Sequence, residues 1–436
     1  MTAIPAGRRV AGWIAALFGL LVLLQRFAVP GLTVVSLLVP AVVAWTVAAR
    51  LAGVLEVDRT RLCWWLAFAG VSAIGMLVQQ QVVDGALISI SAWALMVVVW
   101  MPFVMRAVDR GAATYLCTLR YVSRIAGALA ALAVLMVVLQ LLGLPYRDVF
   151  ATVVPENLQL EGFVISYPIT WGSSIYKANA WIGLEPSFVS AQIGVGLLAA
   201  VLTRARMWLV VLLILGLIAT VAGSGILIVL VGLVVVLLHR SRGVLLRYAP
   251  VGAIAVGISL LTPFGANLLD RSTEFRSDNS SASLRALQPY EVLWPRWIAD
   301  PVGALLGHGP GSSQRIVDST NVLGLLVPTP AKIFFEYGML TGLLLAVFML
   351  ICYWGGPSRT FGVSLLVSLW VLQPGSTTLT ITLPLLVLVT LFSPRWGPPI
   401  ETLDLRRMNG TVRESGPESR SEPAMPAAWR DPARSL

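Results

Sequence analysis

A polar stretch at residues 267–342 interrupts an otherwise apolar chain. It reads NLLDRSTEFRSDNSSASLRALQPYEVLWPRWIADPVGALLGHGPGSSQRIVDSTNVLGLLVPTPAKIFFEYGMLTG, with six basic residues and one of the two histidines of the protein. A connection of this length is usually functional or disordered, and its Trp, Tyr and Leu content argues against disorder. We therefore predict an ordered external loop that carries the chemistry of a membrane protein.

The composition around this stretch is that of an integral membrane protein. The 436 residues are 57 % hydrophobic and only 12 % charged, whereas soluble domains are about a quarter charged. The net charge of +10 does not indicate nucleic acid, because the arginines lie in short clusters between apolar runs. We expect a lipid bilayer as the surroundings of the chain and no nucleic-acid partner.

Apolar runs long enough to cross roughly 30 Å of hydrocarbon predict about twelve transmembrane helices. They lie near residues 10–28, 32–49, 62–81, 86–105, 124–143, 185–203, 207–222, 225–239, 248–264, 333–354, 361–373 and 377–392. The predicted fold class is an all-α polytopic membrane protein with a large external loop between the ninth and tenth helices.

The distribution of arginine predicts the orientation of these helices. Arg8, Arg50 and Arg204 fall on one side of the predicted membrane, whereas the short turns of the other side contain only Arg26. The positive-inside rule then places both termini in the cytoplasm of a multi-pass protein. The predicted parts are helices one to five at 1–143, an external loop at 144–184, helices six to nine at 185–264, the large external loop at 265–332, helices ten to twelve at 333–392 and a disordered cytoplasmic tail at 393–436.

Two lysines and two glutamates stand out near the external side. Lys177 and Lys332 are the only lysines, and they are either incidental or suited as compact charges to bind phosphate. Glu185 and Glu336 are the only carboxylates within predicted helices, where an ionised group costs roughly 2.5–3.5 kcal/mol and so faces the protein interior or a cavity. Each glutamate also has a purely structural interpretation. Glu336 can form an ion pair with Lys332 on one helix face, and Glu185, which Pro186 follows, can be a favourable charge at a helix N-terminus.

The basic residues of the large loop suit a particular kind of ligand. Guanidinium groups bind phosphate oxygens in pairs, so arginines along a membrane surface suit an anionic ligand that is anchored in lipid. His308, in a Gly-His-Gly-Pro-Gly turn, could accept a proton there. A lipid diphosphate is the ligand that fits this pattern.

Three groups of residues carry a family resemblance. The first is SLR at 283–285 with PVGALLGHGPG at 301–311, the second is KIFFEYG at 332–338, and the third is WIGLEPSFVS at 181–190. In this order the chain resembles the O-antigen polymerase and O-antigen ligase superfamily of membrane glycosyltransferases. The resemblance implies a GT-C-like fold and glycosyl transfer from undecaprenyl diphosphate without a metal or another cofactor.

The resemblance also implies roles for individual residues. By match to the motif, Arg285 would stabilise the diphosphate leaving group, with Arg296 and Arg315 as helpers. Many family members have a His-Asn pair before the EyG segment, but residues 327–331 here read VPTPA. The general base therefore stays open among His308, Glu185 and Glu336, and Lys177 and Lys332 stay candidate substrate-binding residues.

The sequence thus predicts a polysaccharide polymerase in the bacterial inner membrane that joins lipid-linked repeat units outside the cytoplasm. The EPS tripeptide at 185–187 and the missing His-Asn favour a polymerase over a ligase, which stays the first alternative. The expected partners are the undecaprenyl-diphosphate oligosaccharide, a flippase and a chain-length regulator. A second alternative is a transporter or flippase whose Glu185 and Glu336 line a path.

Overall fold

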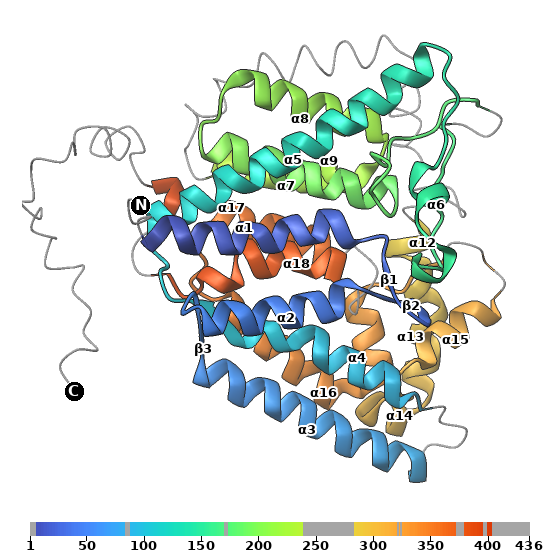
Figure 1. Ribbon diagram of the computed structural model, residues 1–436. Helices are drawn as coiled ribbons and strands as arrows, with labels where there is room; N and C mark the ends of the chain where they lie inside the picture. Colours follow the sequence, from blue (N-terminus) through green and yellow to red (C-terminus); the bar gives the residue numbers. More distant parts are fainter. Residues whose placement is uncertain are drawn as a thin grey trace, which may run out of the picture.

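The computed structural model describes most of the chain outside the middle and the tail. The described residues are 6–82, 88–169, 173–238, 283–320, 322, 325–371, 379–395 and 399–402. The predicted helix at 248–264, the opening of the large loop at 265–282 and most of the predicted disordered tail lie outside them. The described start of that tail is ordered, which corrects the prediction: the Arg395 amide donates to the Gly355 carbonyl at 2.8 Å, and Glu401 accepts from the Ser358 hydroxyl at 2.5 Å. Within the described residues the protein is mostly helical, as predicted (Figure 1).

Four of the described helices are long and apolar enough to cross a membrane. They are α1 (Ala6–Leu24), α3 (Arg59–Val82), α5 (Ala112–Leu141) and α16 (Thr329–Tyr353). The prediction started α5 at residue 124, which is wrong by three turns. The first turns contain Thr118 and Ser123, which are buried against other helices and bond to carbonyls within α5, so they extend the helix beyond its apolar run.

Several shorter apolar helices accompany these four. They are α2 (Leu38–Leu51), α4 (Ile90–Trp100), α7 (Pro186–Leu202), α8 (Met207–Thr220), α9 (Gly223–Leu238), α17 (Arg359–Leu365) and α18 (Leu379–Leu388). Each is shorter than the ~20 residues that cross a bilayer unaided. The length and composition of the described helices indicate a helical membrane protein.

Two small antiparallel ribbons correct the all-helical prediction. Strand β1 (Ala28–Val29) pairs with β2 (Leu32–Ser36), and β3 (Leu55–Val57) pairs with β4 (Met105–Ala107). The predicted helix at 32–49 therefore begins only at Leu38. The β-branched run before it favours a strand, and the preceding Gly31 has a φ of 78°, which suits a turn rather than a helix.

The elements predicted as external gather at the end of the helix bundle opposite the start of α1 (Figure 1). They are the short helices α6 (Val149–Val153), α12 (Ser283–Ala286), α13 (Gln288–Ala299), α14 (Pro301–Leu306) and α15 (Ser312–Ser319). Hydrogen bonds join these external segments to the turns between the helices. Arg26 donates to both carboxylate oxygens of Asp148 at 2.8 and 2.6 Å, and the Ser89 amide donates to the Pro310 carbonyl at 3.1 Å. Segments predicted on one side of the membrane thus lie at one end of the bundle.

A buried arginine joins the chain at the other end of the bundle. Arg61, near the start of α3, is only 1 % exposed and donates to backbone carbonyls from three separate parts of the chain. The acceptors are Phe103 at 3.4 Å, Met105 at 3.1 Å, Cys352 at 3.0 Å, Thr390 at 2.8 Å and Ser393 at 2.6 Å. Carbonyls at helix C-termini lack partners within their helix and carry partial negative charge, so a guanidinium stabilises several of them at once.

Small residues let α7 and α9 pack closely. A Cβ on Gly194 of α7 would lie 2.6 Å from the Gly225 carbonyl oxygen of α9. Ser190, one turn earlier, donates to the Ala222 carbonyl at 2.9 Å and accepts from the Gly225 amide at 3.2 Å. Such contacts between small and hydroxyl residues associate helices in membranes, where the surrounding lipid is as apolar as the helices. The packing fixes the start of α7, which carries Glu185.

Candidate functional site

The glycine-rich turn after α14 lies against a break in α16. The His308 amide donates to the Phe335 carbonyl at 2.9 Å, and the Gly309 amide donates to the Glu336 carbonyl at 3.0 Å. From α3, the Gln79 side-chain amide donates to the Leu306 carbonyl and reaches the Glu336 carbonyl at 3.5 Å. Two of the three sequence groups behind the family resemblance, 301–311 and 332–338, thus form one site.

Glycines allow this close approach. Gly338 has φ 74° and ψ 175° inside α16, so the helix breaks there, and Gly307 of the turn has φ 90°. A Cβ on Gly338 would lie 2.3 Å from the Leu305 carbonyl oxygen, and one on Gly307 would lie 2.3 Å from that of Glu336. Both conformation and space therefore require glycine at the two positions.

We expect Gly338→Ala to lower the free energy of unfolding by roughly 3 kcal/mol, because it combines backbone strain with a clash against backbone. Unfolding in mixed detergent micelles, followed by circular dichroism, measures the change. The control is Gly19→Ala in α1, where a Cβ meets nothing within 4 Å and the change stays within about 1 kcal/mol. Equal stability of the two variants would contradict the described break.

Glu336 is the buried centre of the site. Its side chain is 0 % exposed, and its Oε1 accepts from the Lys332 ammonium at 2.9 Å and from the Ser313 hydroxyl at 2.5 Å. Its Oε2 is buried without a hydrogen-bond partner among the described residues. The Lys332–Glu336 ion pair predicted from the four-residue spacing is confirmed. Because the ion pair uses Oε1, Oε2 can still accept a hydrogen bond.

Lys332 links this buried carboxylate to the surface. Its side chain is 16 % exposed, whereas Glu336 and Ser313 are completely buried. A buried ion pair loses the solvation of both charges, and the additional hydrogen bond from Ser313 offsets part of that loss. Lys332 is therefore the partly exposed member of this buried cluster, with its ammonium held by Glu336.

His308 is oriented by contacts to both of its ring nitrogens. The ring stacks on Phe335 with the centroids 4.3 Å apart and the planes 7° from parallel. Its Nε2 lies 3.4 Å from Asp300 Oδ2, and its Nδ1 lies 3.4 Å from the Phe335 carbonyl oxygen. Asp300 also caps α14 through the Gly303 amide at 3.0 Å. These contacts fit a histidine that holds the turn in place better than one that faces a substrate.

The predicted arginines are distributed over three short helices. Arg285 lies in α12, and its side chain is outside what the structure describes. Arg296 is exposed on α13, and Arg315 is exposed on α15, two residues after the buried Ser313. All three helices lie with α14 at one end of the bundle (Figure 1). The helices that contain the three arginines therefore lie at the same end of the bundle as α14.

Glu185 and Lys177 lie in the other predicted external segment. Glu185 precedes Pro186, the first residue of α7, so the predicted position at a helix N-terminus is confirmed. Its carboxylate is mostly buried and accepts from the Ser187 hydroxyl at 3.0 Å. The Lys177 ammonium lies 5.8 Å from the centre of the Tyr167 ring. Glu185 thus lies at the start of α7 beside Ser187, whereas Glu336 lies in α16 beside Lys332 and Ser313.

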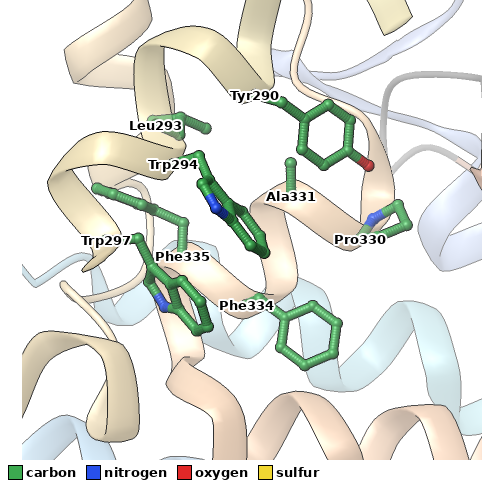
Figure 2. Close-up of a pocket in the computed structure, with 8 residues that line it drawn as sticks. All are labelled: Tyr290, Leu293, Trp294, Trp297, Pro330, Ala331, Phe334 and Phe335. Carbon is green, nitrogen blue, oxygen red and sulfur yellow. The ribbon is translucent and has the colours of Figure 1, made fainter. Parts of the chain in front are cut away.

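An apolar pocket of about 190 Å³ borders the site (Figure 2). One wall is a face of α13 and the other is the first part of α16, and the tyrosine and tryptophan side chains of α13 point toward α16. The lining residues are Tyr290, Leu293, Trp294, Trp297, Pro330, Ala331, Phe334 and Phe335. Phe335 also stacks on His308, so the pocket and the glycine-rich turn share a side chain.

Two residues of the site were missed in the sequence. Ser313 is the second residue after the Gly-Pro-Gly turn and could have been noticed as a polar residue near a motif. Gln79 begins a run of three glutamines in an apolar helix, which is the stronger signal, because polar residues in such helices usually have a role. The pocket has no sequence signal of its own, since its two walls are far apart in the chain.

The described residues contain no group of three or more His, Cys, Asp or Glu side chains placed to hold a metal ion. Comparison with protein-family models, with curated proteins and with solved structures finds no match to this chain.

Proposed function

We propose that this protein is a glycosyltransferase of the bacterial inner membrane that polymerises undecaprenyl-diphosphate-linked repeat units on the outer side. The observation that carries the proposal is the meeting of residues 301–311 and 332–338 around the buried Glu336 carboxylate. These two segments carry the family resemblance, and they are far apart in the sequence. The proposal includes a GT-C-like arrangement of about twelve spans with both termini in the cytoplasm.

In the proposed reaction, an acceptor sugar hydroxyl attacks the anomeric carbon of the donor glycan. The bond from that carbon to the diphosphate oxygen breaks, and the lipid diphosphate leaves with the electron pair. Arg285, Arg296 and Arg315 would stabilise the charge that grows on the leaving group. Lys332, the partly exposed member of the buried cluster, would contribute a fourth cation.

The proposal assigns the general base to Glu336. Its Oε2 has no described partner, while Lys332 and Ser313 hold Oε1. Because this carboxylate is completely buried, the proposal requires the site to open before the acceptor hydroxyl can give its proton to Oε2. His308 is a weaker candidate because both ring nitrogens face protein oxygens. Glu185 lies at the start of α7 beside Ser187. A base within reach of the substrate hydroxyl contributes about 10²–10⁴-fold to the rate of such reactions.

The activity is tested with purified protein in nanodiscs and a synthetic undecaprenyl-diphosphate oligosaccharide. We expect longer lipid-linked glycans and equimolar release of undecaprenyl diphosphate, both measured by mass spectrometry and both unaffected by a metal chelator. Arg285→Ala should lower the initial rate by at least about 100-fold, the scale observed when one donor to a developing charge is removed. Arg285→Lys keeps the charge and should retain part of the rate. An unchanged rate in Arg285→Ala would remove this residue from the site.

A second candidate function is transport of the intact lipid-linked oligosaccharide. It is favoured by the pair of Gln25 and Gln192, which are buried and lie 3.3 Å apart between α1 and α7. Buried polar residues can line a path across a membrane. Transport would move the substrate between leaflets without changing its length, so product length separates the two functions.

A further inference from the structure

We propose that the pocket between α13 and α16 holds the part of the isoprenoid chain next to the diphosphate of the lipid substrate. This subsite rests on the proposed function, and it explains how a mobile lipid would be fixed beside Lys332. The exposed lining of the pocket is entirely apolar. A sugar ring in it would lose water from several hydroxyls, whereas the buried lining atom without a described partner is the single Trp297 indole nitrogen, so most of those hydroxyls would cost free energy. A hydrocarbon chain has no such cost.

The shape of the pocket comes from one face of an amphipathic helix. Tyr290, Leu293, Trp294 and Trp297 recur at the spacing of helix turns, so they share one side of α13. The Trp294 and Trp297 ring centres lie 4.9 Å apart, and burial raises the pKa of the Tyr290 hydroxyl, which favours its neutral form. Trp294 is 47 % exposed, so the pocket opens to the surface.

Each wall of the pocket contains a basic residue next to a lining residue in the sequence. Arg296 lies between Trp294 and Trp297 in α13 and is exposed, and Lys332 follows the lining residue Ala331 in α16. An occupant with an apolar chain and an anionic head therefore matches the charges around the pocket as well as its lining. A polyprenyl diphosphate has both parts.

The far side of the pocket leads onto an apolar surface. The Phe334 ring lies so close to Gly342 that a Cβ there would be 2.7 Å from it. The neighbouring Met339, Leu340 and Leu343 of α16 are 45 %, 51 % and 53 % exposed. A chain that leaves the pocket along α16 therefore stays in contact with apolar side chains and with the bilayer interior.

The test uses the full chain in nanodiscs and undecaprenyl monophosphate with a photoreactive diazirine near the phosphate end of its isoprenoid chain. We expect adducts within 290–297 and 330–335, mapped by mass spectrometry after proteolysis. Trp297→Ala should lower the adduct yield at least tenfold, and Trp297→Phe should retain most of it. The control is Trp208→Ala in α8, whose tryptophan is 61 % exposed and does not line the pocket. Size-exclusion profiles show that each variant is folded.

Three results would overturn the subsite. Adducts confined to other helices would place the chain elsewhere. Equal competition by unlabelled phosphatidylglycerol would identify the occupant as an ordinary membrane lipid. If the unmodified, folded protein gives no adducts in the pocket, another part of the chain or a second copy covers it. If the protein elongates glycans but the probe labels other helices, the subsite is wrong and the proposed reaction stands. Labelling in the pocket without sugar transfer overturns the proposed reaction and keeps a polyprenyl phosphate site.

Discussion

Arg61→Ala is expected to lower the free energy of unfolding by about 3–5 kcal/mol, the largest effect on stability that we anticipate. The substitution removes a donor from five backbone carbonyls at once. Two of them keep another donor, since the Ser393 amide lies 3.3 Å from the Thr390 carbonyl oxygen and the Cys352 thiol 3.5 Å from that of Phe103. Each buried acceptor left without a donor costs about 1–3 kcal/mol, although water that enters the space recovers part of this. Unfolding in dodecyl sulfate and dodecyl maltoside mixtures, followed by circular dichroism, measures the loss.

The matched control is Arg59→Ala, which removes the same side chain two residues earlier on an exposed part of α3. We expect this variant to unfold within about 0.5 kcal/mol of the unmodified protein, as surface substitutions usually do. If the two variants lose the same stability, the carbonyl cluster around Arg61 does not hold the helix ends together. Arg61→Lys should fall between them, because a single ammonium cannot reach all the acceptors.

Glu336→Gln is expected to lower the rate of glycan elongation by at least about 100-fold, while the amount of folded protein stays near that of the unmodified chain. The amide keeps the shape of the side chain and removes its ability to accept a proton. Turnover is measured with the purified variant in nanodiscs, and accumulation of the unextended lipid-linked unit is measured in cells. Glu291→Gln, at an exposed carboxylate of α13, is the control and should elongate normally.

A second substitution separates a structural pair from a catalytic base. Lys332→Met leaves the Glu336 carboxylate buried without its cation, so we expect low protein abundance. Combining Lys332→Met with Glu336→Gln removes both charges and should restore abundance without restoring elongation. A Glu336→Gln protein that elongates at the normal rate would limit this glutamate to holding Lys332.

Periodicity and hydropathy predicted the helices well where one run is long and apolar. The start of α7 at Pro186 and the end of α16 near residue 354 agree with the sequence, because a proline at the first turn and a Gly-Gly-Pro run after the last turn are strong local signals. The strand at Leu32–Ser36 was missed, because an apolar β-branched run reads equally as strand or helix until its partner is known.

The sequence predicted the part of the site that lies within one helix and missed the part that depends on contacts between helices. The Lys332–Glu336 pair follows from spacing along one helix, so it needed no tertiary information. Ser313, Gln79 and the apolar pocket depend on contacts between α3, α13, α15 and α16, which no local pattern specifies. The break at Gly338 was also hidden, since glycine in a membrane helix is common and need not interrupt it.

The sequence by itself determined that this is a helical membrane protein and which short segments contain its charged and glycine-rich residues, because hydrophobic burial and helix spacing act over neighbouring residues. Only the tertiary structure decided that the glycine-rich turn lies on the α16 break and that Ser313 and Lys332 hold one oxygen of Glu336 while the other has no partner in the described part of the chain. It also decided that aromatic side chains enclose a pocket beside them. Those arrangements arise from packing between helices far apart in the chain, where side-chain volume and unsatisfied backbone groups select one fit among many.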